Sequence, residues 1–161
     1  MCARLLEEVV ECLVSRRPDP DSRSMNRVAQ VAGTIRIEAP LEEVFDTAAD
    51  SRNEPSFNPA TTQVELLTPE PIGLGSRFQA RMGKAGMDML IELTEFDRPH
   101  RLGSVTTSSM METSGTLTFT ADAVTTVTAW DWQVRPRVGF GFSDPWWDRW
   151  VAAWSAASGP A

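Results

Sequence analysis

The sequence predicts an α+β protein in which a curved, seven-stranded antiparallel sheet packs against helices. Apolar and polar residues alternate in six segments after Pro59, and the stretches between these segments are short and turn-like. Connections this short join antiparallel neighbours. One helical pattern follows the first strand and another ends the chain, and each has an apolar stripe that a sheet would cover.

The first strand is expected in "VAQVAGTIRIEA", residues 28–39, where Ile35 and Ile37 alternate with polar residues. Pro40 ends this strand because proline cannot donate to a strand ladder. The segment "PLEEVFDTAAD" then predicts a helix, with proline in its first turn and early acidic residues that suit the helix dipole. The next segment, "SRNEPSFNP", has room for one more helical turn because two prolines interrupt it.

The six later strands each present one apolar face, as expected when one face of a sheet is buried. Their expected ranges are 61–68, 75–83, 86–96, 100–107, 110–121 and 124–135. In the turn before the second of these strands, Gly73 and Gly75 are expected to adopt backbone angles that side chains disfavour.

The last helix is expected in "SDPWWDRWVAAWSAASG", with Asp144 as its N-cap and Pro145 in the first helical position. Its apolar stripe consists of Trp147, Trp150, Val151 and Trp154. At the other end of the chain, residues 1–24 are expected to be an extension made of a short amphipathic helix and a Pro-rich linker. Residues 25–161 are then a single domain.

Composition narrows the classes of function. The net charge of −7 disfavours nucleic-acid binding, which needs basic patches. No apolar run approaches the roughly 18 residues that span a bilayer, so membrane insertion is not expected. The sequence has one histidine, and its two cysteines both lie near the N-terminus, so neither a metal site nor a disulfide framework is expected. It also contains no cofactor-binding motif. The default location is the cytoplasm.

Several motifs occur in an order that is characteristic of one superfamily. They are "IEAPLEEVFDTAAD", "SFNP", "PIGLGSRF" and "EFDRPHRL". Over residues 28–157 the chain resembles the helix-grip (SRPBCC) scaffold of the START and birch-pollen-allergen superfamily, and in particular the polyketide cyclase/dehydrase and lipid transport family. It departs from that family where Val124-Thr125-Thr126 replaces a usual Gly-Thr-Arg, and in a final helix of only about 13 residues.

The resemblance implies a ligand cavity between the concave face of the sheet and the C-terminal helix. The residues expected to line it are Phe57, Phe78, Met82, Met89, Ile91, Leu117, Phe119, Trp130, Trp132, Trp147 and Trp150. Methionine and aromatic stripes are also the usual content of an ordinary packed core, and that interpretation stays open.

Signals for catalysis are few. His100 is expected in an exposed turn, and Asp131, between two tryptophans on a strand, is expected on the opposite, wet face. Three functions therefore remain. The first is binding of a small hydrophobic molecule such as a lipid, a polyketide or an aromatic metabolite. The second is a cyclase or dehydratase that uses the same cavity, and the third is a protein-interaction scaffold with a filled core.

Overall fold

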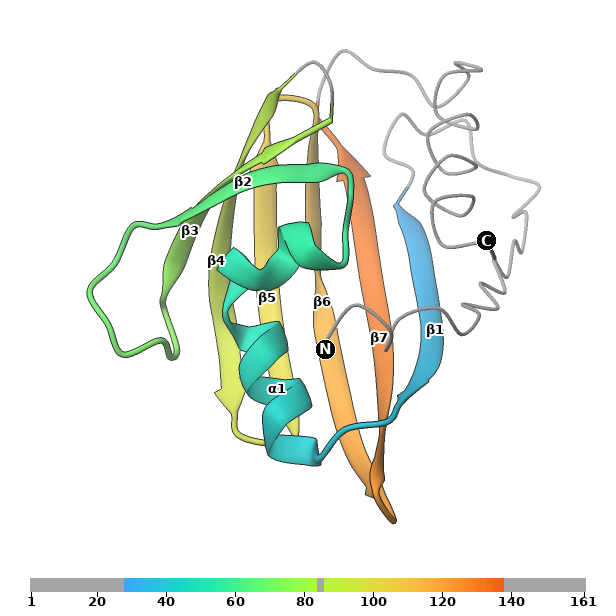
Figure 1. The fold of residues 1–161 in the computed structure, drawn as a ribbon. Helices are drawn as coiled ribbons and strands as arrows, with labels where there is room; N and C mark the ends of the chain where they lie inside the picture. The colour runs from blue at the N-terminus through green and yellow to red at the C-terminus, as the bar shows by residue number, and fades with distance from the viewer. Residues whose placement is uncertain (1–27, 84–85, 138–161) are drawn as a thin grey trace, which may run out of the picture.

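A curved antiparallel sheet of seven strands forms the body of the molecule (Figure 1). The structure is a computed structural model, and it describes residues 28–83 and 86–137. The strands are β1 (Ala29–Ile37), β2 (Thr61–Leu66), β3 (Arg77–Met82), β4 (Met87–Asp97), β5 (Arg101–Ser108), β6 (Met111–Asp122) and β7 (Thr125–Pro136). They lie in the order β1-β7-β6-β5-β4-β3-β2, so the first strand pairs with the last and the others follow the chain. The predicted fold is confirmed, and every predicted strand end lies within two residues of the observed one.

Two short helices follow β1 and lie in front of the sheet (Figure 1). Helix α1 (Leu41–Ala49) has an extended Pro40 as its N-cap, with two glutamates in its first turn. The next element is a 3₁₀ helix, η2 (Ser51–Ser56), which begins where the carboxylate of Asp50 accepts a hydrogen bond from the backbone N–H of Arg52 at 3.1 Å. Its six residues make two turns at three residues per turn, with Pro55 inside the helix, so the prediction of at most one further turn is wrong.

The aromatic contacts of α1 identify its face of the sheet. The ring of Phe45 lies 5.3 Å from those of Phe96 on β4 and Phe119 on β6, measured between ring centroids, in edge-to-face geometry. Residues directly opposite each other on antiparallel strands point to the same side. The cross-strand pairs that include Phe96 and Phe119 therefore define one continuous surface, which we call the inner face; the opposite surface is the outer face.

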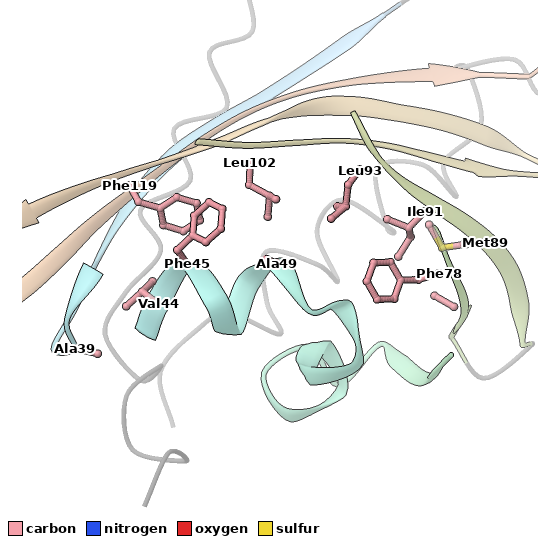
Figure 2. Packing of buried hydrophobic residues seen from close by; sticks show 11 residues of the cluster. Ala39, Val44, Phe45, Ala49, Phe78, Met89, Ile91, Leu93, Leu102 and Phe119 are labelled. Atoms are coloured by element: carbon pink, nitrogen blue, oxygen red, sulfur yellow. The ribbon is translucent and has the colours of Figure 1, made fainter. Parts of the chain in front are cut away.

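The hydrophobic core lies between α1 and the inner face (Figure 2). Phe45, Phe78 and Phe119 are among its most deeply buried side chains. Its buried members are Ala39, Val44, Phe45, Ala49, Phe78, Ala80, Met89, Ile91, Leu93, Leu102 and Phe119. The periodicity of two residues thus places the large apolar side chains of several strands under one short helix.

The two glycines of the β2–β3 turn differ. Gly75 has a φ of 82°, in the left-handed region that favours glycine, as predicted. Gly73 lies outside that region, and a Cβ atom there would meet nothing within 4 Å. The prediction of a special backbone conformation is therefore wrong for Gly73.

Two predicted segments fall outside the described residues. They are the extension at residues 1–24 and the C-terminal helix that contains Trp147 and Trp150. Neither described helix is long and apolar enough to cross a membrane.

Candidate ligand-binding face

Eight of the residues that the sequence predicts to line a ligand site lie together on the inner face, as the cross-strand pairing shows. They are Phe78, Met82, Met89, Ile91, Leu117, Phe119, Trp130 and Trp132. The predicted alternation is confirmed for all eight, whereas their contact with a ligand stays a prediction. Phe57 does not join them: it caps the end of η2 and is 42% exposed.

One half of the inner face is closely packed. Here the ring of Phe45 on α1 contacts both Phe96 and Phe119. Leu102 of β5 belongs to the same core as Phe45 and Phe119 (Figure 2). We call this region, defined by these four residues, the α1-covered half. Its side chains are large and mostly buried, so it is filled core.

The other half carries short side chains. Along β5 and β6 the inner positions beyond the α1-covered half hold Ser104, Thr106, Thr113 and Gly115, which pair across the strands. We call these four residues, together with Trp132 opposite Gly115, the hydroxyl-rich half. All five are half-buried, and none belongs to the core cluster of the described residues.

Two glycines let the tryptophans of β7 lie against the sheet. Gly33 on β1 faces Trp130, and a Cβ atom built on it would lie 2.8 Å from Cε2 of the indole. Gly115 on β6 faces Trp132, and its Cβ would lie 2.8 Å from Cε3 of that indole. Each indole therefore occupies the space of a missing side chain, over the neighbouring strand. Sequence reasoning missed both glycines, although the alternation in "SGTLTF" places Gly115 on the side of Leu117.

Charged side chains of the strands point to the outer face. The carboxylate of Asp131 is exposed there, as predicted, and accepts a hydrogen bond from Nε2 of Gln30 at 2.9 Å. Glu92 pairs with an arginine of β3, and Glu95 pairs with Arg101 at 2.8 Å. The predicted position of His100 is also confirmed, in an exposed turn before β5. The described inner-face positions of the strands hold only apolar residues, glycine, serine and threonine.

A hollow lies on the outer face. It has a volume of about 260 Å³ and is lined by Ser114, Gly115, Thr116, Asp131 and Gln133. Its lining is polar and open to solvent, unlike the apolar, enclosed sites that hold small ligands. The inner face is therefore the stronger candidate.

Ion pairs join the helices to loops of the sheet. Arg98, in the β4–β5 turn, donates two hydrogen bonds to the carboxylate of Asp46 on α1, at 2.6 and 2.7 Å. These hydrogen bonds lower the pKa of Asp46, against an opposing effect of burial, and the positive charge of Arg98 adds a smaller effect in the lowering direction. Arg52 bridges Asp50 and Glu70 in the same way, and its hydrogen bonds lower the pKa of Asp50. These contacts position α1 and η2 over the inner face.

Metal chemistry gains no support from residues 28–83 and 86–137. Among them, no cluster of three or more His, Cys, Asp or Glu side chains could hold an ion.

The curved sheet with helices against its inner face is the helix-grip architecture of the START and birch-pollen-allergen superfamily. The sequence profile described as "Polyketide cyclase / dehydrase and lipid transport" matches residues 28–158. Because the match covers most of the chain, this protein belongs to that family, and the resemblance found in its motifs is confirmed. No curated protein matches the sequence significantly.

Solved structures with the same fold come from bacteria and plants. The Zhui aromatase/cyclase from Streptomyces sp. R1128 is 19% identical, with a TM-score of 0.65 over 81% of this chain and 88% of its own. A START superfamily protein from Mycobacterium smegmatis is 11% identical, with a TM-score of 0.64 over 80% and 90%. The major latex-like protein 151 from Panax ginseng is 11% identical, with a TM-score of 0.59 over 81% and 94%. At these identities the likeness shows the fold alone.

Proposed function

We propose that this protein binds a small hydrophobic molecule, such as a lipid, a polyketide or an aromatic metabolite, against the inner face of its sheet. The observation that carries the proposal is the contrast within that face. The α1-covered half is filled by large side chains, whereas the hydroxyl-rich half has short ones, beside indoles that lie over Gly33 and Gly115. A curved sheet lined in this way leaves depth for a ligand.

The C-terminal segment would complete the site. Its expected helix carries Trp147 and Trp150 on the stripe that would face the sheet. In this proposal the ligand lies between those two tryptophans and the hydroxyl-rich half. Met82 and Met89 would border it on the β3–β4 side, where flexible thioether side chains adapt to irregular shapes.

A cyclase or dehydratase is the second candidate, favoured by the description of the family. General acid–base catalysis needs a titratable group within hydrogen-bond reach of the reacting atoms. The described inner-face positions of the strands supply hydroxyl groups, whereas the charged side chains of the same strands lie on the outer face. This distribution favours binding over catalysis.

A matched pair of substitutions tests the proposal. Thr106 and Thr107 are neighbours on β5, are both half-buried and point to opposite faces. Thr106→Leu should fill the hydroxyl-rich half and abolish binding, whereas Thr107→Leu should leave it unchanged. Binding is measured by thermal shift against a panel of lipids and aromatic compounds, and by native mass spectrometry of protein purified without added ligand. A wild-type protein that carries no ligand and binds none of the panel would leave the filled scaffold as the better interpretation.

A further inference from the structure

Three consecutive inner positions of β7 carry polar groups, and only the first has a partner in the described part of the chain. Thr126, which is fully buried, donates a hydrogen bond from Oγ1 to the carbonyl oxygen of Ala39 at 2.8 Å. Oγ1 of Thr128 and Nε1 of Trp130 are buried and have no hydrogen-bond partner there. Thr128 is only 6% exposed. Buried polar groups are nearly always hydrogen-bonded, so these two require an explanation.

The two unpaired groups belong to neighbouring inner-face positions of β7. Residues two apart on a strand point to the same side, with their Cα atoms about 6.4–6.8 Å apart. Thr128 lies opposite Phe119 and Ile35, so an apolar wall surrounds its hydroxyl. Trp130 lies opposite Leu117. The pair stands at the border between the α1-covered half and the hydroxyl-rich half.

The position of the indole nitrogen is fixed by the neighbouring strand. Cε2 of Trp130, the atom bonded to Nε1, lies 2.8 Å from the place where a Cβ of Gly33 would be. The glycine lets the indole settle over β1, and Leu117 borders it on the β6 side. The donor is therefore held on the inner face by packing.

The chemistry of the pair defines its complement. An indole N–H can only donate, and a threonine hydroxyl can donate as well as accept. An oxygen atom with two lone pairs can accept from both. Because the inner-face positions of the described strands hold no charged side chain, a neutral oxygen fits this setting better than a carboxylate or a phosphate.

We propose that Thr128 and Trp130 form a hydrogen-bonding subsite for a neutral oxygen of the ligand. The ligand is then an oxygenated hydrophobe, such as an aromatic ketone, a quinone or a phenol, and not a plain hydrocarbon. This inference rests on the proposed function, because it assigns a ligand class to the same inner face.

The test uses two probes of the same shape on the full-length protein: acetylnaphthalene and isopropenylnaphthalene, substituted at the same ring position. The first has a carbonyl oxygen where the second has a methylene group. Isothermal titration calorimetry should show that the wild-type protein binds the ketone about tenfold more tightly, as expected for one or two net hydrogen bonds. Equal affinity for the two probes would overturn the subsite and leave the proposed function standing. Binding of neither probe would overturn the proposed function and the subsite with it.

Two variants locate the preference. Thr128→Val, which keeps the shape of the side chain, and Trp130→Phe should each reduce the ratio of the two affinities to about threefold or less. Thr118→Val, on the outer face of β6, is the control and should keep the wild-type ratio. An unchanged ratio in both inner-face variants would overturn the assignment. The wild-type ratio decides the case if either variant fails to fold.

Discussion

The two halves of the inner face are built from the same strands but are filled in opposite ways. On β6 the inner positions run from Phe119 to Gly115, from a large side chain to none, away from α1. On β7 they run from Thr128, opposite Phe119, to Trp132, opposite Gly115. A large residue therefore faces a small one at each end of this run, Phe119 opposite Thr128 and Trp132 opposite Gly115, whereas two large residues, Leu117 and Trp130, face each other between them.

Within residues 28–83 and 86–137, the difference between the halves lies in whether a helix covers them. In the α1-covered half, Phe45 reaches down from the helix and completes a packed layer above Phe119. In the hydroxyl-rich half, the indole of Trp132 lies over Gly115 and therefore projects only a short way from the sheet. Alternation therefore decides which face is apolar, whereas the cover by α1 decides which part of that face is filled core.

The largest expected loss of stability comes from a substitution in the α1-covered half. Phe45→Ala removes a fully buried ring that contacts two others, and should lower the free energy of unfolding by about 3–5 kcal/mol. Trp132→Ala should cost clearly less, because this half-buried side chain loses fewer contacts. Urea denaturation followed by circular dichroism measures both. Equal losses would mean that the hydroxyl-rich half is also filled core.

A smaller effect is expected when the glycine beneath Trp132 gains a side chain. In Gly115→Ala the new Cβ would overlap the backbone and the indole of Trp132, and overpacking of this kind costs about 1–3 kcal/mol. Gly73→Ala is the matched control, since its Cβ would meet nothing within 4 Å. We expect Gly115→Ala to weaken ligand binding as well, by pushing the indole off the sheet. Urea denaturation and calorimetry of both variants check this, and a Gly115→Ala protein as stable as Gly73→Ala would contradict the close approach.

A third prediction separates two threonines of the same strand. Thr126→Val leaves the buried carbonyl of Ala39 without its donor and should cost about 1–3 kcal/mol. Thr128→Val removes a hydroxyl that has no described partner, so the ligand-free protein should be equally stable or slightly more stable. Denaturant midpoints of the two variants give the comparison. A similar loss for Thr128→Val would assign its hydroxyl a structural role.

The fold and the content of its inner face could be predicted because the signals are local. Alternation within each strand places Phe78 and Trp130 on the same side of the sheet as Phe119, and proline and glycine mark the turns. The rule that a glycine in a turn needs a special φ held for Gly75 and failed for Gly73, because it depends on the turn type and not on the residue alone.

The details of the site depend on the register between distant strands. Gly33 meets Trp130 only because β1 pairs with β7, and no local pattern fixes which residues stand opposite each other. The same holds for the contact of Arg98 with Asp46, which are 52 residues apart. The prediction of the site considered only apolar residues and so overlooked Thr128, whose buried hydroxyl has no hydrogen-bond partner in the described part of the chain.

The smallest expected effect concerns the attachment of α1 to its half of the sheet. The hydrogen bonds from Arg98 lower the pKa of Asp46 below its ordinary value of 3.8, so the pair stabilises the folded state when Asp46 is ionised. This stabilisation is complete above that ordinary value and is lost as the pH falls through the lower pKa of the folded state. Asp46→Asn should therefore lower the melting temperature slightly at neutral pH, because both partners are about half exposed and water screens them. The difference in melting temperature between variant and wild type should vanish at pH values well below 3.8.

Glu43→Gln, on the exposed surface of the same helix, is the control for the loss of one negative charge. If Asp46→Asn left the melting temperature unchanged at every pH, the packing of α1 on the sheet would be stabilised by Phe45 and its aromatic partners and not by the ion pair.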